Sequence, residues 1–253
     1  MTVLVGIKCK DGIVIGSDSS ATFSAGQIRT IEQTTKKIEV LHGKLIVAGT
    51  GQIGLGQRFC DVIDRSYAEG KFKNKNAVQM ASEMTAVTRN NFAATGVQQG
   101  QFGALVAYPA DRGIHLCEFA VQDFQPELKT DSIWYASMGS GQLIADPFLG
   151  LMRSVFWQSG MPTLQDGIFI ATWALQHAID VNAGGVGGAI QMAVLTNEKS
   201  EPVARMLTQD ELTEHRENVS GAISHLGSYG KKLSGTEAAT VPELPSPPAQ
   251  AAG

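Results

Sequence analysis

The first eighteen residues, MTVLVGIKCKDGIVIGSD, constrain the fold of this chain more than any other stretch. Apolar residues begin directly after Thr2, so we expect the N-terminus to open a buried strand. A turn around Lys10, Asp11 and Gly12 reverses the chain, and a second apolar run carries Asp18 back towards the start. The pattern therefore predicts a hairpin that holds residue 2 inside the fold.

Thr2 is the candidate nucleophile. If Met1 is removed, the Thr2 hydroxyl and a free amine share one carbon framework. A threonine hydroxyl needs a base to take its proton, and an N-terminal amine is one base that enzymes use. The ordinary pKa of that amine is about 7.7–8.0, so a modest downward shift leaves much of it neutral near pH 7. The alternative is that a small second residue merely permits removal of Met1.

The rest of the chain alternates between strand pairs and helix pairs. We expect strands at 2–8, 13–17, 35–41, 44–48, 102–108, 114–119, 132–138, 189–195 and 203–206. We expect a loop at 21–26, a glycine-rich bend at 49–56, and helices from there to 67 and at 76–95, 141–158, 164–182 and 209–225. This order predicts an α+β fold, a four-layer αββα sandwich of two antiparallel sheets. The continuous apolar runs LVGI, IVI and LIVA fit sheets covered on both faces.

Composition excludes several other classes of protein. A net charge of −4 without a basic face argues against nucleic-acid binding. The longest apolar runs, such as GIFIATWAL, fall short of the roughly 20 residues that span a membrane. No secretory signal is visible, so we expect a cytoplasmic protein. The three cysteines and five histidines have no disulfide or metal spacing, and we expect neither a metal nor a cofactor.

The C-terminal part differs in composition from the rest. Thr208 and Glu211 form a capping box, which predicts a helix after the last strand. The final residues, PELPSPPAQAAG, cannot bury a core. We therefore expect a folded domain at 1–206, a helical extension at 207–228 and a disordered tail at 229–253.

Five segments that follow Thr2 carry a recognisable pattern when taken in order. They are GSDSSAT at 16–22, TKKIEV at 35–40, KLIVAGTG at 44–51, GSGQ at 139–142 and AIDVNAGG at 178–185. Together they resemble the proteasome β-subunit family of N-terminal-nucleophile hydrolases. Among its members, the chain is most similar to the bacterial HslV and the betaproteobacterial proteasome homologue. The resemblance covers residues 2–206 and implies a threonine endopeptidase.

The resemblance also implies a set of catalytic residues: Thr2, Asp18, Lys37, Gly51, Ser140 and Asp180. In it, Gly51 supplies the oxyanion hole, Ser140 lies near the threonine amine and Asp180 is a second aspartate. Strand alternation alone does not decide between Lys36 and Lys37, and the family pattern favours Lys37. The chain departs from the family at Ala183, where a serine is usual.

The implied partners are peptide or protein substrates and further copies of the chain. The resemblance predicts a homo-oligomeric ring, stacked into a double ring, with an ATPase unfoldase as a possible partner. Gly49 and Ile53 are expected to line a roomy, apolar substrate pocket. One alternative is an inactive scaffold subunit that retains Met1. Another is a dinucleotide-binding oxidoreductase, because GTGQIG at 49–54 matches the GxGxxG pattern.

Overall fold

The structure is a computed structural model that describes residues 1–25, 28–111, 113–181, 185–199 and 201–235. The strands are β1 (Leu4–Lys8), β2 (Gly12–Ser17), β3 (Ser20–Ala25), β4 (Ile28–Thr34), β5 (Ile38–Leu41), β6 (Leu45–Gly51), β7 (Phe102–Ala110), β8 (Gly113–Phe119), β9 (Pro126–Leu128), β10 (Tyr135–Met138), β11 (Gln191–Glu198) and β12 (Glu201–Met206). The helices are α1 (Ile53–Ala68), α2 (Ala77–Ala93), α3 (Gln142–Phe156), α4 (Leu164–Val181) and α5 (Gln209–Leu233).

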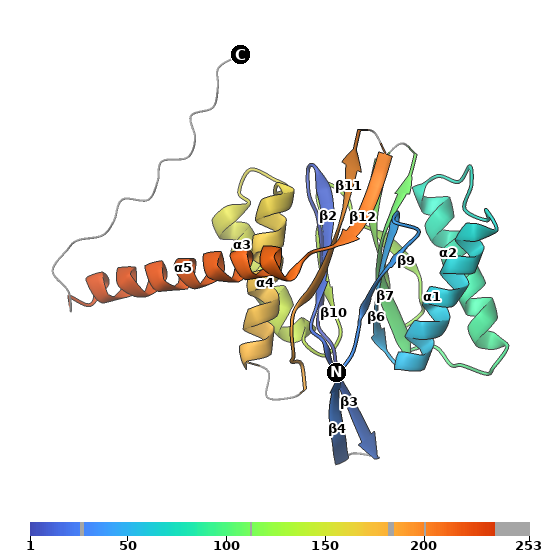
Figure 1. Ribbon diagram of the computed structural model, residues 1–253, viewed down its shortest axis with the longest axis horizontal. Coiled ribbons are helices and arrows are strands. Elements are labelled where there is room, and N and C mark those ends of the chain that lie inside the picture. The colour runs from blue at the N-terminus through green and yellow to red at the C-terminus, as the bar shows by residue number, and fades with distance from the viewer. Residues whose placement is uncertain (26–27, 112, 182–184, 200, 236–253) are drawn as a thin grey trace.

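Two antiparallel sheets form the centre of the molecule. One has the strand order β10-β1-β2-β11-β12 and the other has the order β5-β6-β7-β8-β9. Figure 1 shows the two sheets face to face, with α3 and α4 outside the first and α1 and α2 outside the second. This arrangement confirms the predicted four-layer αββα sandwich.

The strands of the first hairpin are buried on both faces. Val5 and Ile7 of β1 pack under the helices α3 and α4, whereas Leu4 points into the core between the sheets. In β2, Val14 belongs to the helix side, and Ile15 belongs to the core between the sheets. Burial on both faces explains why these strands read as continuous apolar runs instead of alternating polar and apolar residues.

The structure corrects the prediction for the segment after Asp18. The predicted loop at 21–26 is largely strand β3, which pairs with an unpredicted strand, β4. The two make a ribbon that projects from the body at the end where the N-terminus lies (Figure 1). Phe23 and Ile31 are paired across this ribbon and both are exposed. Without a covering layer, the ribbon lacks the apolar runs that identify the buried strands.

Helix α5 begins as the capping box predicts but continues further than expected. The Thr208 side chain accepts from the backbone N–H of Glu211, and the Glu211 side chain accepts in return from Thr208 N–H. Leu212 and Val219 are buried against the domain, and the helix then extends away from it to Leu233, beyond the predicted end at 225 (Figure 1). Residues 236–253 of the predicted tail lie outside the described residues. Among the described helices, none combines the length and apolar character that crossing a bilayer requires.

Candidate active site

Thr2 is held at the point where β1 meets the segment before α3. It follows the N-terminus, which lies at the end of the sandwich where β3 and β4 project (Figure 1), and the whole residue is 9% exposed. The backbone N–H of Thr2 donates to Ser140 Oγ at 3.1 Å, and its carbonyl accepts from the backbone N–H of Gly141 at 3.1 Å. Gly139 has a φ of +92°, and a Cβ at this position would lie 2.3 Å from the Thr2 carbonyl oxygen. Only glycine allows this close approach, which fixes the start of the chain.

Ser140 acts on Thr2 and not on the helix that follows. A serine that directly precedes a helix can cap it through its hydroxyl oxygen. In the structure the N-cap is Gly141, which makes no side-chain capping bond. The Ser140 hydroxyl instead lies between the N–H and the carbonyl oxygen of Thr2, at 3.1 Å and 3.4 Å.

Asp18 lies at the end of β2, beside Thr2, and is fully buried. Its Oδ1 accepts from the backbone N–H of Val3 at 3.0 Å. Its Oδ2 accepts from the backbone N–H groups of Ser20 at 3.2 Å and Gly187 at 3.1 Å. Three backbone donors therefore bind the two carboxylate oxygens and hold Asp18 in place next to the candidate nucleophile.

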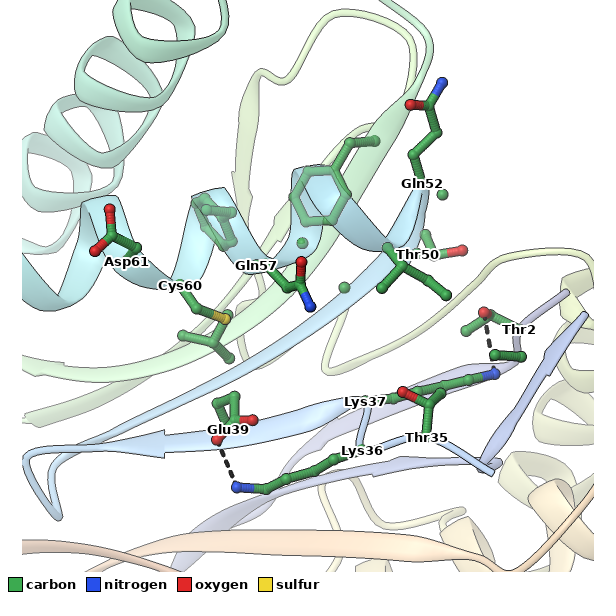
Figure 2. Close-up of a pocket in the computed structure, with 18 of the residues that line it drawn as sticks. Thr2, Thr35, Lys36, Lys37, Glu39, Thr50, Gln52, Gln57, Cys60 and Asp61 are labelled. Carbon is green, nitrogen blue, oxygen red and sulfur yellow. Dashed lines mark hydrogen bonds and ion pairs between the residues drawn. The ribbon is translucent and has the colours of Figure 1, made fainter. Parts of the chain in front are cut away.

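Lys37 joins Asp18 to Thr2. Its Nζ donates to Asp18 Oδ1 at 2.7 Å and lies 3.2 Å from Thr2 Oγ1. It also donates to the carbonyl oxygen of Met1 at 2.9 Å. Figure 2 shows the Lys37 side chain directed at Thr2, whereas Lys36 turns the other way and pairs with Glu39. The structure therefore brings Lys37, and not Lys36, to the candidate nucleophile.

Burial determines the electrostatics of this pair. The side chains of Lys37 and Asp18 are 7% and 0% exposed. Desolvation lowers the pKa of Lys37 from its ordinary value of 10.5, while the charge of Asp18 and the hydrogen bond to it oppose this shift. A protonated Lys37 places a positive charge beside Thr2 Oγ1, which favours the hydroxyl losing its proton. The arrangement suits the activation of a nucleophile at residue 2.

Gly51 lies at the end of β6, on the wall of a cavity that also contains Thr2. Its φ is +113°, and a Cβ there would lie 2.2 Å from the carbonyl oxygen of Gln101. The backbone at this strand end therefore requires glycine. Its assignment to an oxyanion hole stays a prediction.

The cavity that opens at Thr2 has a volume of about 590 Å³. It lies between the segment that leads into β5 and helix α1, and Gly49 and Ile53 both line it. Apolar side chains such as Val47 and Phe102 form part of its wall. The wall also carries carboxylates that the sequence did not reveal: Glu39, Asp61 and Asp64.

Asp180 is not brought to this cluster. It lies in the last turn of α4, is exposed, and accepts a hydrogen bond from Gln176 at 2.7 Å. Because Asp180 is part of helix α4, its carboxylate lies on the surface of this helix, beside Gln176, and not next to Ser140. The departure at Ala183 lies outside the described residues.

Sequence reasoning missed two residues that hold the cluster together. Gln191 in β11 accepts from the Lys37 backbone N–H at 2.9 Å and donates to the Thr35 carbonyl at 2.7 Å. Gly187 supplies one of the N–H groups that bind Asp18. Gln191 left a signal, because it is a polar residue within the otherwise apolar run AIQMAVL.

The fold rules out the dinucleotide-binding alternative. That fold needs a parallel βαβ unit around its glycine motif. Here GTGQIG joins β6 to α1, and the next strand, β7, is antiparallel to β6. Among the described residues, no group of three His, Cys, Asp or Glu side chains is placed to hold a metal ion.

In sequence, this chain is similar to proteasome subunits. Residues 2–195 match the family model described as "Proteasome subunit". Over 203 residues, the chain is 24% identical to proteasome subunit beta type-7-B and 23% identical to beta type-7-A, both of Arabidopsis thaliana. Each match covers 79% of this chain and 67% of the plant protein.

Solved structures of the same fold are Anbu (ancestral beta-subunit) from Yersinia bercovieri and an Anbu (Gly-1) mutant from Hyphomicrobium sp. strain MC1. The first has a TM-score of 0.67 at 14% identity, covering 96% of this chain and 99% of the other. The second has a TM-score of 0.70 at 14% identity, covering 95% and 100%. A particular similarity to HslV or to the betaproteobacterial homologue stays a prediction. From its motifs, its fold and the match over residues 2–195, this chain belongs to the proteasome subunit family.

Proposed function

We propose that this chain is a threonine endopeptidase whose nucleophile is Thr2 after removal of Met1. One observation carries the proposal. Lys37 Nζ lies within hydrogen-bond distance of both Asp18 Oδ1 and Thr2 Oγ1, and Ser140 Oγ lies 3.1 Å from the nitrogen of Thr2. The Thr2 hydroxyl, the buried Lys37 cation and the Thr2 nitrogen, which becomes a free amine when Met1 is removed, thus lie close together.

In the proposed reaction, the Thr2 hydroxyl oxygen attacks the carbonyl carbon of a peptide bond while the Thr2 amine takes the hydroxyl proton. The carbon–nitrogen bond breaks, the proton passes to the leaving amine, and an ester to Thr2 remains. Water then gives a proton to the same amine and attacks the ester carbon. The bond from this carbon to Thr2 Oγ1 breaks, the proton returns to Thr2 Oγ1, and the second product leaves with a new carboxyl group. Each step conserves charge and needs no cofactor.

The other residues have supporting roles in this proposal. Protonated Lys37 stabilises negative charge on Thr2 Oγ1, Asp18 holds Lys37 in place, and Ser140 orients the amine. The Gly51 N–H binds the oxyanion, a contribution worth about 2.7–4 kcal/mol per donor where it has been measured. The position of Asp180 gives no support to a catalytic role for it.

Family membership supports a ring-shaped assembly. We propose a homo-oligomeric ring, paired into a double ring, that encloses the threonines and acts on peptide or protein substrates. An ATPase unfoldase as partner and a cytoplasmic location stay predictions.

The test is the chemical state of residue 2. Intact-mass analysis should show loss of Met1, and an electrophile specific for N-terminal threonine should label Thr2. Thr2→Ala should abolish labelling and peptide hydrolysis while leaving the assembly intact, and Thr2→Ser, which keeps a hydroxyl, should retain part of the activity. Retention of Met1, with no label, would support the inactive scaffold alternative instead.

A further inference from the structure

The cavity beside Thr2 has two ends with different chemistry. Figure 2 shows Thr2 at one end, and Cys60 and Asp61 of α1 at the other. The Thr35–Glu39 segment passes along one side, and Gln57 lies on the opposite side, on α1. In the proposed reaction, the residue that precedes the cleaved bond must enter from the Thr2 end. Its side chain then points along the cavity towards Cys60.

The far part of this cavity carries an excess of negative charge. Its wall includes the carboxylates of Glu39, Asp61 and Asp64. Two lysines also line it, but Lys37 is committed to the buried pair with Asp18. Lys36 is then the single lysine of this wall that faces the carboxylates. Arg65, which does not line the cavity, pairs with Asp61, and His42 lies 3.1 Å from Asp64.

The field of these carboxylates reaches the inner wall. Burial raises the pKa of the Cys60 thiol to about 11, and the charge of Glu39 adds to this effect, with a further contribution from Asp64. Lys36 opposes them but does not reverse the shift. A neutral thiol and a nearby carboxylate together form a wall that accepts hydrogen bonds and favours positive charge.

The cations that now neutralise these groups can be displaced. The side chains of Lys36 and Glu39 are 56% and 39% exposed, and those of Arg65 and Asp61 are 60% and 62% exposed. Exposed pairs of this kind contribute little to stability, because water screens both charges. A substrate cation held inside the cavity can therefore replace Lys36 as the partner of Glu39 at little cost.

The cavity also offers apolar surface to a long aliphatic stem. Val47, Leu41 and Phe102 all line it. Glu39 follows Lys37 by two residues, and two residues of an extended chain advance by about 7 Å. Lysine and arginine combine an aliphatic stem with a charged head, and they place the stem on apolar surface while the head finds polar partners.

Resting on the proposed peptidase activity, we propose that this cavity selects a lysine or arginine side chain on the residue that precedes the cleaved bond. The aliphatic stem packs against the apolar side chains of the wall, and the charged head binds Glu39, with Asp61 as second carboxylate. An apolar side chain of the same length would desolvate these carboxylates without offering a hydrogen bond, which is unfavourable.

The experiment compares the full-length mature protein on fluorogenic peptides that differ only at this residue: arginine, lysine, leucine, phenylalanine or glutamate. We expect kcat/KM to be at least tenfold higher for arginine or lysine than for leucine, and lowest for glutamate. Glu39→Gln should reduce kcat/KM at least tenfold for the arginine peptide but less than twofold for the leucine peptide. Lys36→Met, which removes the competing cation, should raise kcat/KM for the arginine peptide.

Glu69→Gln is the matched control, because Glu69 is exposed at the end of α1, pairs with Lys71 and does not line the cavity. It should leave all the rates unchanged. If the electrophile labels Thr2 but leucine or phenylalanine peptides are preferred, the inference is wrong and the peptidase proposal stands. The same holds if Glu39→Gln weakens all peptides equally. If no peptide is cleaved and Thr2 is not labelled, both proposals fail.

Discussion

Replacing Lys37 by methionine tests whether the buried pair holds the site together. The substitution keeps a similar length but leaves Asp18 charged and fully buried without a counter-charge. Breaking a buried pair in this way costs about 3–5 kcal/mol. Asp18 would still accept three backbone N–H bonds, from Val3, Ser20 and Gly187, which compensate part of the loss. We therefore expect the free energy of unfolding to fall by the lower value, about 3 kcal/mol.

Asp18→Asn should be more harmful, and the difference can be worked out from the hydrogen bonds. An asparagine side chain has one acceptor oxygen, whereas both oxygens of Asp18 accept backbone N–H groups. The amide nitrogen would face one or two backbone donors, each costing about 1–3 kcal/mol. Lys37 would also lose its charge partner. We expect a total loss of about 4–6 kcal/mol.

The control is Lys36→Met, because Lys36 forms an exposed pair with Glu39. Its effect on stability should stay within about 0.5 kcal/mol. Guanidinium unfolding at one fixed subunit concentration measures all three variants, since assembly contributes to apparent stability. In a peptide-hydrolysis assay, Lys37→Met should lose at least about a hundredfold in kcat. If Lys37→Met unfolds at the same denaturant concentration as the control, or if Asp18→Asn is the milder change, this account of the buried pair is refuted.

Three further predictions concern the strand end, the pH profile and the last helix. Gly51→Ala should destabilise the protein by more than about 2 kcal/mol in guanidinium unfolding, because a Cβ there meets a carbonyl oxygen at 2.2 Å and the φ of +113° is unfavourable for alanine. Gly54→Ala, which enters open space in α1, should be neutral or stabilising. Burial lowers the pKa of Lys37, so Lys37 loses its proton at a lower pH than a free lysine would. Because the proposed reaction needs protonated Lys37, kcat should decline on the alkaline side before pH 10.5. A rise of kcat through this range would instead make Lys37 the base. Thr208→Ala should cost about 1 kcal/mol in thermal unfolding without changing kcat, whereas Thr213→Ala, inside the same helix, should not destabilise it.

Much of the fold followed from local patterns. The β1–β2 hairpin, the β7–β8 hairpin and the capping box at Thr208 depend on residues that are close in sequence, and all three form. The ribbon of β3 and β4 was missed because Phe23 and residues 30–34 are exposed, and of its described side chains only Ser20 and Ala21 at its start are buried, so burial leaves no periodic signal in its sequence. The end of helix α5 was predicted too early for a related reason. Ile223 and Leu233 are exposed, so the apolar residues in this part of the helix do not follow a packing pattern.

The sequence by itself determined that residue 2 begins a buried hairpin and that Asp18 returns beside it. These relations span 15 or 16 residues, and strand period and turn chemistry encode them. The family resemblance named Lys37, Ser140 and Asp180, but only the tertiary structure decided that Lys37 meets Asp18, that Ser140 reaches Thr2 across 138 positions, and that Asp180 stays away. Such contacts depend on how strands are ordered in a sheet and how sheets stack, and local sequence periodicity carries no information about either.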